Sequence, residues 1–398
     1  CSALHRILLG RQGRVDRGVR RLDRQPREHM QVAVLIGGRS PEHDISVASA
    51  KQVLAHLDRD KWTPWPVLLD RDGTWRPSRR AFDHGADWDP RDTASLHGPM
   101  RPGLAMDWLL DEVAVDVVFP VLHGAFGEDG TVQGLLELYD VPFVGSGCAA
   151  SAMAMDKLRS RQAYESAGVP IAPAYVPADH TARDSSAAFA ALRDSVGVPA
   201  FAKVDVSGST VGVTRVCNDA DLAAFFTSYQ AEFRRWFAEG EVQGEEITVP
   251  VIGNTGDSLE ALPPVGIYPV DDDWFTHDAK YRPGATEELV PPRGLNEAQL
   301  REVERLAVRC HEALVCDGMS RTDMIYTPDG PVVLETNTIP GLTSNSLLPR
   351  SAEAAGLSFP ALLTRLLELA QQRRGRAAAA RSRPDAAAPS QRSQTAQT

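Results

Sequence analysis

Two carboxylate side chains near the C-terminal end of the chain are spaced to face each other across a hairpin. Residues 320–326 and 331–337 flank a Pro-Asp-Gly turn, which is typical of a three-residue hairpin loop with glycine in the left-handed position. Pairing about Asp329 sets Asp323 opposite Glu335, with Cβ atoms about 5 Å apart. Two carboxylates this close repel each other unless a cation lies between them.

The neighbouring residues indicate which cation would suit this hairpin. Asn337 lies two residues after Glu335, so it shares the same face of the strand, and Arg321 pairs opposite Asn337. Asp, Glu and Asn offer hard oxygen ligands, which suit Mg²⁺ carrying phosphates. A solvated face on an exposed hairpin is the alternative, but the apolar residues 332–334 favour a partly buried hairpin and a metal site.

Two further segments have the composition of anion-binding sites. Lys203 ends an apolar run and precedes a Ser/Gly/Thr loop, whose N–H groups could hold phosphates beside the lysine charge. A plain hairpin turn explains that pattern equally well. Ser346 precedes a helical pattern that ends near Gly356, and the N–H groups at such a start bind carboxylates. An ordinary capped helix is the alternative there.

Two acid–histidine pairs follow apolar runs early in the chain. Glu42 and His43 come after the first run, and His123 and Glu128 come after a later one. Because the carboxyl ends of parallel strands meet at one edge of a sheet, these pairs could converge. A lone histidine is otherwise usually a core or surface feature.

The elements that position these residues alternate between strand and helix. In the first third of the chain we predict strands at 31–38, 116–124 and 141–147 and a helix over 46–57. Beyond it we predict a helix over 149–167, strands at 199–205, 211–216, 246–253 and 263–269, and a helix over 219–237. Residues 271–294 are polar and lack periodicity, which indicates a functional or disordered loop. The early alternation indicates a parallel sheet with ligands at its C-terminal edge.

Composition narrows the function classes. Of the 398 residues, 43% are hydrophobic and 24% charged, which is ordinary for a globular protein of several domains. The formal net charge is −11 although both ends are rich in arginine, so the acidic excess lies in residues 30–370. Such a core repels nucleic acid and anionic membranes, and we expect neither as a partner. No apolar run reaches the roughly 20 residues of a membrane helix or forms a signal peptide, so we expect a cytoplasmic protein.

The five cysteines indicate a reduced protein. None forms a CxxC motif or a regular framework, so we interpret them as structural thiols. Cys310 and His311 with Cys316 could form a metal cluster, but their segment has the pattern of an amphipathic helix and favours plain packing.

We expect five segments along the chain. They are a basic disordered extension at 1–29, an α/β substrate domain at 30–150, a central nucleotide-binding subdomain at 151–245, a C-terminal subdomain with the metal site at 246–370, and a disordered tail at 371–398. Met30 precedes the first strand, and we expect it to be the natural start.

Together these segments resemble the D-alanine–D-alanine ligases of the ATP-grasp superfamily, over about residues 31–370. The motifs that carry the likeness are GGRSPEHDIS (37–46), PVLHGAFGEDGTVQG (120–134), MDKLRSR (155–161), GSTVG (208–212), GEEITV (244–249), DAKY (278–281), SRTDM (320–324) and LETNTIPGLTSNSL (334–347). The resemblance implies an α/β (α+β) ATP-grasp fold with an N-terminal parallel-sheet, preATP-grasp-like domain.

The resemblance also implies roles for individual residues. For ATP these are Lys157 and Lys203 at the phosphates, the 208–212 loop over the γ-phosphate, Glu239 to Val242 at the adenine hinge, Glu246 at the ribose, and Leu334 as a further nucleotide-binding residue. Asp323, Glu335 and Asn337 would hold two Mg²⁺ (or Mn²⁺) ions. The residues implied around the first D-alanine are Glu42, His123, Ser209 and Tyr281. Those implied around the second D-alanine and the developing oxyanion are Arg321, Gly341, Ser346 and Leu347, with Lys280 on a closing loop within 271–294.

The implied reaction is ATP-dependent ligation of two D-alanines through an acyl phosphate, which releases ADP and supplies peptidoglycan precursors. ATP and D-alanine would be its small-molecule partners, and a homodimer is compatible with the family. One alternative is a ligase of the same fold that joins D-alanine to another D-amino or D-hydroxy acid, such as a paralogue from an antibiotic cluster. Another is a non-catalytic nucleotide-binding protein, which would be expected to lose a metal ligand or Arg321.

Three local features bear on these alternatives. The Lys280-Tyr281 pair is typical of relatives that form an amide rather than an ester. The sequence VDVSG after Lys203 and the sequence EGEV at 239–242 depart from the family pattern. Because both lie at the ATP side, we expect them to affect ATP affinity rather than the type of reaction.

Overall fold

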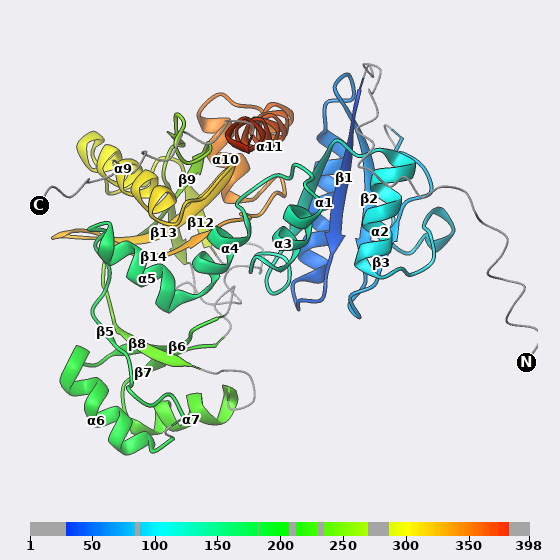
Figure 1. Ribbon diagram of the computed structural model, residues 1–398. Helices are drawn as coiled ribbons and strands as arrows, with labels where there is room; N and C mark the ends of the chain where they lie inside the picture. The colour runs from blue at the N-terminus through cyan, green and yellow to red at the C-terminus, as the bar shows by residue number, and fades with distance from the viewer. Residues whose placement is uncertain are drawn as a thin grey trace, which may run out of the picture.

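Three β-sheets organise the described part of the chain (Figure 1). The structure is a computed structural model that describes residues 29–83, 88–181, 183–206, 212–229, 235–269 and 286–381. Within these ranges, no helix combines the length and apolar character needed to cross a membrane.

The first sheet has the strand order β3-β2-β1-β4. Strand β1 pairs in parallel with β2 on one side and with β4 on the other. The elements of this region are β1 (Met30–Gly37), α1 (His43–His56), β2 (Trp62–Leu69), β3 (Trp75–Pro77), a 3₁₀ turn (Thr93–Ser95), α2 (Pro102–Trp108), a π turn (Leu109–Val113), β4 (Val117–Leu122) and α3 (Thr131–Leu138). The predicted parallel sheet is confirmed, with β3 added as an antiparallel edge.

The structure of this sheet differs from the sequence prediction at two strands. Strand β2 was not predicted, because Pro64 and Pro66 remove two N–H donors from its sequence and make it read as a loop. The strand predicted at 141–147 is reduced to one bridge, in which Phe143 pairs with Val118 beside β4.

Alternate residues of β1 enter two separate cores, as the two-residue period of a strand requires. Val32, Val34 and Ile36 pack with α1 and with α11 (Phe359–Arg381) from the far end of the chain. Ala33 and Leu35 pack with α2 and α3 on the opposite face. The first sheet is therefore covered on one face by a C-terminal helix, which places the two ends of the described chain side by side.

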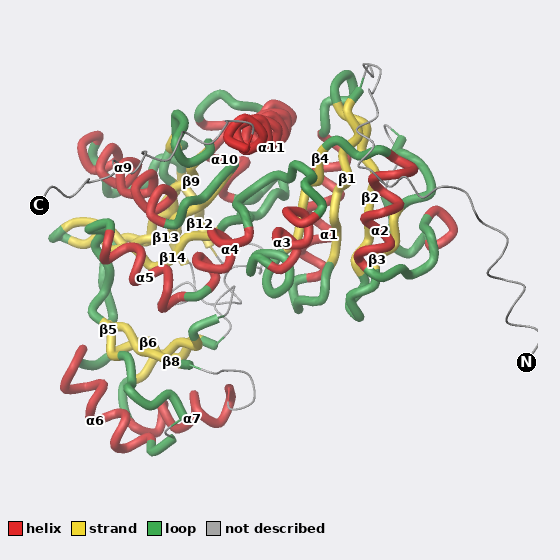
Figure 2. The backbone as a smooth tube through the Cα atoms, in the orientation of Figure 1, coloured by secondary structure: helices red, strands yellow, loops and turns green. Residues whose placement is uncertain are grey.

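The small sheet is antiparallel, in the order β5-β8-β6-β7. It is built from β5 (Ala174–Tyr175), α6 (Ser185–Val196), β6 (Ala200–Val204), β7 (Val213–Val216), α7 (Asp219–Tyr229) and β8 (Trp236–Gly240). The helix predicted over 219–237 was too long, because the buried residues Trp236 and Phe237 belong to strand β8. Figure 2 shows this sheet and its two helices as a separate lobe.

The large sheet has the order β12-β11-β9-β13-β14, with β10 beside β9. Its elements are β9 (Glu245–Ile252), β10 (Glu260–Ala261), β11 (Val265–Pro269), β12 (Thr286–Leu289), α9 (Glu297–Ala313), β13 (Met319–Thr327), β14 (Gly330–Asn337) and α10 (Leu347–Ala354). Strand β12 lies inside the segment 271–294 that was predicted to be an irregular loop, so that prediction was wrong for these four residues. Cys310 and Cys316 pack in the core beneath this sheet, where burial raises the pKa of both thiols to about 12.

The helix predicted over 149–167 is two helices, α4 (Cys148–Met155) and α5 (Lys157–Ser166). Asp156 separates them, and its carboxylate accepts the N–H groups of Leu158 and Arg159 as the cap of α5. Both helices contribute to the core of the large sheet, through Ala154 and Tyr164. This packing differs from the expected boundary at residue 151, which assigned them to the small lobe.

The structure also contradicts the expectation that residues from 371 onward form a disordered tail, in the part that it describes. Helix α11 continues to Arg381, so the prediction was wrong for the residues up to that point. Leu366, Leu367 and Ala370 anchor the helix in the core that it shares with β1.

Candidate functional site

The hairpin β13–β14 has the register predicted at its functional end. Asp323 pairs with Glu335 and Arg321 with Asn337, while β9 pairs along the other edge of β13. The register then shifts, so that Met324 pairs with Val333 and Leu334 forms a bulge in β14.

Asp323 is buried and fully engaged by hydrogen bonds. Arg321 donates from Nε to Oδ1 at 2.8 Å and from Nη2 to Oδ2 at 2.7 Å, which is a bidentate pair. Thr248 Oγ1 donates to Oδ1 at 2.5 Å and Asn337 Nδ2 to Oδ2 at 3.1 Å. Asp323 keeps only 8% of its surface exposed, which excludes a solvated face on an exposed hairpin.

Arg321 is held in its charged form by this pairing. Burial acts to lower the pKa of the guanidinium, but the opposing charges of Asp323, Glu335 and Glu128 outweigh it and raise the pKa above its ordinary value. Arg321 is therefore a cation in this structure.

Glu335 meets a cation from a distant part of the chain. Lys157, the first residue of α5, donates from Nζ to Glu335 Oε2, and burial leaves 14% of the lysine side chain exposed. Burial acts to lower the pKa of Lys157, and the charge and hydrogen bond of Glu335 reverse this and raise it. The two facing carboxylates are therefore compensated by two side-chain cations rather than left to repel each other.

A second buried carboxylate lies between two cations on the small sheet. Glu239 of β8 accepts from Arg161 on one oxygen and from Lys203 of β6 on the other. Burial acts to raise the pKa of Glu239, but Lys203 and Arg161 together lower it. Sequence reasoning missed Arg161 as a partner, although it lies four residues after Lys157 and so on the same face of α5.

The donor set of the hairpin fits the metal that the sequence predicts. Asp323, Glu335 and Asn337 present only hard oxygens from two adjacent strands. Among the described residues, no group of three or more His, Cys, Asp or Glu side chains is spaced to hold a metal, and the predicted set has two carboxylates and one amide. Two of these three side chains already have a cationic partner, because Arg321 pairs with Asp323 and Lys157 pairs with Glu335.

The N-terminal domain contributes a second polar group. His123, directly after β4, lies with Nδ1 3.6 Å from Glu128 Oε1 and Nε2 3.2 Å from Ser49 Oγ. Glu42, at the start of α1, places Oε2 next to Gly124, where an added Cβ would lie 2.6 Å from it. Gly124 also has φ +72°, so glycine suits this position both in conformation and in space.

Charge interactions link Glu128 of this group with Arg321 of the hairpin. Burial raises the pKa of Glu128, the His123 interaction opposes that shift, and the charge of Glu42 adds to it. Glu128 in turn contributes to the raised pKa of Arg321 on β13. The predicted convergence of the two acid–histidine pairs is therefore seen for Glu42, His123 and Glu128, and Arg321 lies within their field.

Helix α10 begins at Leu347, ten residues after β14 ends at Asn337. Ser346 is the N-cap residue, but its Oγ engages Thr343 rather than the helix, accepting the N–H at 3.1 Å and lying 2.7 Å from Oγ1. An added Cβ on Gly341 would lie 2.8 Å from Ser346 Oγ, so a larger residue there would have to displace that hydroxyl. Leu347 is the first residue of the helix.

The remaining predicted residues are less closely connected to this centre. Val242 lies in the connection between β8 and β9, Glu246 lies in β9 opposite Ile325, and Leu334 is the bulged residue of β14. Ser209, Lys280 and Tyr281 lie outside the described residues.

Comparison with known proteins identifies two matching family models that together span most of the chain. Residues 31–146 match the model described as D-ala D-ala ligase N-terminus, and residues 163–368 match D-ala D-ala ligase C-terminus. The boundary between them falls in α4 and α5.

Curated relatives and solved structures agree with these matches. A D-alanine–D-alanine ligase of Syntrophobacter fumaroxidans is 39% identical over 86% of this chain and 98% of its own length, and one of Deinococcus radiodurans is 36% identical over 86% and 99%. The D-alanine–D-alanine ligase structure from Coxiella burnetii has a TM-score of 0.74 at 28% identity and covers 89% of this chain and 97% of its own. The VanG D-Ala:D-Ser ligase from Enterococcus faecalis has a TM-score of 0.72 at 28% identity, with 86% and 99% covered.

Proposed function

Because the chain belongs to the D-alanine–D-alanine ligase family, we propose that it joins two D-alanines at the expense of ATP, releasing ADP and phosphate. The observation that carries the proposal is the alternation of buried cations and carboxylates from α5, β6, β8 and the β13–β14 hairpin. Lys157, Lys203 and Arg321 give such a site the positive charge that phosphoryl transfer requires. An ATP-bound ligase structure from Bacillus anthracis, with a TM-score of 0.66, supports ATP as the nucleotide.

The first step activates a carboxylate, which is a poor electrophile. The carboxylate oxygen of the first D-alanine attacks the γ-phosphorus of ATP, the bond to the β,γ-bridging oxygen breaks, and an acyl phosphate and ADP form. Lys157 and Lys203 bind the phosphate oxygens and offset the charge of the transferring group. Glu42 and His123 orient the amino acid, and a carboxylate there suits its ammonium group.

The second step forms the amide. The neutral amine of the second D-alanine attacks the acyl carbon, and phosphate leaves from the resulting tetrahedral intermediate. Arg321 and the N–H of Gly341 stabilise the oxyanion of that intermediate. Ser346 and Leu347, at the start of α10, lie on the side of the second substrate's carboxylate, where helix N–H groups favour an anion.

Asp323, Glu335 and Asn337 are the residues that would hold Mg²⁺ or Mn²⁺ in this site. When bound, two such ions supply charge neutralisation to the β- and γ-phosphates. The residues of the chain would then redistribute their pairing, since Lys157 and Arg321 already engage both carboxylates.

The second candidate function is a ligase of the same fold that joins D-alanine to another D-amino or D-hydroxy acid. Structural similarity to the VanG D-Ala:D-Ser ligase is nearly as high as to the D-alanine–D-alanine ligase of Coxiella burnetii, so the fold alone does not separate D-alanine from D-serine as second substrate. The Lys280-Tyr281 pair favours an amine nucleophile and hence an amide product. We place the reaction in the cytoplasm as a source of peptidoglycan precursor, with a homodimer as a compatible assembly.

Product analysis tests the proposal directly. The protein is incubated with ATP, Mg²⁺ and each of D-alanine, D-serine and D-lactate, and products are identified by mass spectrometry. We expect D-alanine-dependent release of ADP and phosphate with D-alanyl-D-alanine as the main product. Release of AMP and pyrophosphate would overturn the phosphoryl-transfer mechanism, and a dominant mixed product would favour the second candidate. ATP binding without turnover on any substrate would indicate a non-catalytic nucleotide-binding protein.

A further inference from the structure

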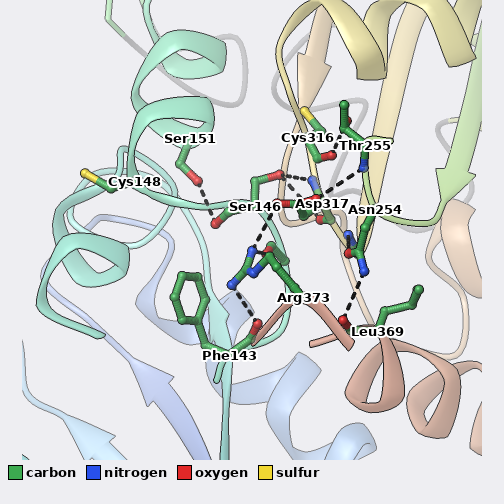
Figure 3. Close-up of polar contacts among 12 residues, drawn as sticks. Phe143, Ser146, Cys148, Ser151, Asn254, Thr255, Cys316, Asp317, Leu369 and Arg373 are labelled. Carbon is green, nitrogen blue, oxygen red and sulfur yellow. Dashed lines mark hydrogen bonds and ion pairs between the residues drawn. The ribbon is translucent and has the colours of Figure 1, made fainter. Parts of the chain in front are cut away.

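A polar junction that belongs to neither half of the site joins the N-terminal domain to the large sheet. Arg373, on α11, donates to the carbonyl oxygens of Gly145 and Phe143, the latter at 3.1 Å from Nη2. Its Nη1 lies 3.4 Å from Asp317 Oδ2, and its guanidinium stacks 4.3 Å from the centre of the Phe143 ring. Figure 3 shows the arginine between the two chain segments.

The two segments under Arg373 are in direct backbone contact. Gly318 has φ +72° and Gly145 has φ +94°, and an added Cβ on Gly318 would lie 3.1 Å from Gly145 N. Ser146 Oγ also accepts the N–H of Asp317 at 3.1 Å. Only glycine allows so close an approach in this conformation, so the crossing is specific to these two positions.

A second bridge reinforces the same crossing. The fully buried Asn254 donates from Nδ2 to Leu369 O of α11 at 3.0 Å and accepts the N–H of Gly318 at 3.0 Å (Figure 3). Thr255 donates its N–H to Asp317 Oδ1 at 3.2 Å. The middle of α11 is therefore tied by side chains to the loop that precedes β13.

Each segment leads within a few residues to one half of the site. The Phe143 segment pairs with β4 through Val144 N and Val118 O at 2.9 Å, and β4 ends at Leu122, directly before His123. Asp317 stands two residues before β13, the strand that carries Arg321. The Arg373 guanidinium thus contacts the segments that precede or flank both halves of the site, but it contacts neither His123 nor Arg321.

We propose that Arg373 is a positioning residue that fixes the β4 edge, with His123, against the β13 strand, with Arg321, and so sets the binding of the first D-alanine. The inference rests on the proposed function for the identity of that substrate. The nucleotide side depends on Lys157, Lys203 and Glu239, which lie on α5 and the small sheet and do not involve the junction. Replacement of Arg373 should therefore weaken the binding of the amino acid and leave the binding of the nucleotide unchanged.

The test compares Arg373→Met with Arg376→Met, a matched control on the same helix whose side chain is 43% exposed and pairs with Asp257. We expect Arg373→Met to raise the KM for the first D-alanine about 10-fold, because small misplacements of binding groups are costly. The Kd for ATP should change less than twofold, and the control should change neither. Arg373→Lys should recover part of the loss, since lysine keeps the charge but not the planar fork.

Two further measurements keep the test decisive. The double variant Arg373→Met with Asp317→Asn removes both charges, so it should fold well and still show the raised KM. Hydrogen exchange of whole wild-type and variant protein should accelerate in peptides covering 141–147 and 317–319, but not 200–204. A folded Arg373→Met with unchanged exchange and KM would overturn the inference, and so would equal changes in the D-alanine KM and the ATP Kd. If the wild type shows no D-alanine-dependent turnover, the proposed function fails, and the exchange result still decides whether Arg373 holds the junction.

Discussion

The two sides of the site treat their buried carboxylates in opposite ways. On the hairpin and small-sheet side, Asp323, Glu335 and Glu239 each lie against an arginine or lysine of the chain. On the N-terminal side, Glu128 is buried next to His123 and within the field of Glu42. The pKa of Glu239 is lowered by its cations in spite of burial, whereas that of Glu128 is raised by burial.

This difference matches two kinds of substrate. A side with permanently charged pairs can exchange partners with a polyphosphate and its cations without taking up or releasing protons. A side on which carboxylates lie around a histidine favours an incoming ammonium group. Ion pairs with lysine and arginine therefore characterise the ATP side, whereas the buried Glu128 beside His123 characterises the amino-acid side.

The largest expected effect concerns the hairpin carboxylates. Asp323→Asn or Glu335→Gln should lower turnover by at least about 100-fold, because each removes a charge at the centre of a phosphoryl-transfer site. Release of ADP under saturating ATP and D-alanine measures it. Near-normal turnover in both variants would reduce the pair to a structural feature of the hairpin.

The next effect concerns stability on the ATP side. Glu239→Gln leaves Arg161 and Lys203 buried without their shared anion, so we expect a loss of about 2 kcal/mol in the free energy of unfolding near pH 7. Urea denaturation measures the change, with Glu241→Gln on the exposed Arg215 pair as the control. An unchanged unfolding midpoint would show that solvent already compensates these cations.

A smaller effect concerns how the free energy of unfolding depends on pH. The pKa shifts of Glu128 and Glu239 predict dependences of opposite sign. The folded pKa of Glu128 lies above its ordinary value of 4.5, so the native state binds the proton more tightly than the unfolded chain and stability falls as pH rises through that window. Relative to Glu128→Gln, the wild type should therefore lose stability from about pH 4.5 upward. Relative to Glu239→Gln, it should lose stability as pH falls below 4.5, because that pKa is lowered. If the stability differences measured against the two variants changed in the same direction with pH, the contrast between the two sides of the site would be wrong.

The smallest effect concerns the end of the chain. Deleting residues 382–398 should leave the melting temperature unchanged, because that segment is poor in apolar residues. Deleting from residue 371 removes Arg373 and should lower it by a few degrees, as loss of hydrogen bonds to a charged group costs about 1.5–3 kcal/mol. Equal melting temperatures for the two deletions would mean that the end of α11 adds nothing to the domain junction.

Most strands were predictable where hydrophobic runs were continuous and turns were marked. The pairing of Asp323 with Glu335 was predicted correctly, but the three-residue loop was not, because Gly330 pairs with Thr327 and the bulge at Leu334 restores the predicted register. Strand β2 was missed because its prolines hide a strand that is stabilised by neighbours on both sides. The single helix over 149–167 was wrong because Asp156 caps a new helix, a local preference that hydrophobic periodicity does not register.

The sequence by itself determined the local chemistry of this protein: the facing pair Asp323 and Glu335, the lysines, and the family to which its motifs point. Only the tertiary structure decided which cation meets which carboxylate, since Lys157 and Glu335 are 178 residues apart in the chain. It also decided that Arg373, in a segment expected to be disordered, lies at the junction of two domains. The physical reason is that turn and strand preferences act over a few residues, whereas ion pairs between distant elements form only once packing has removed water from between them.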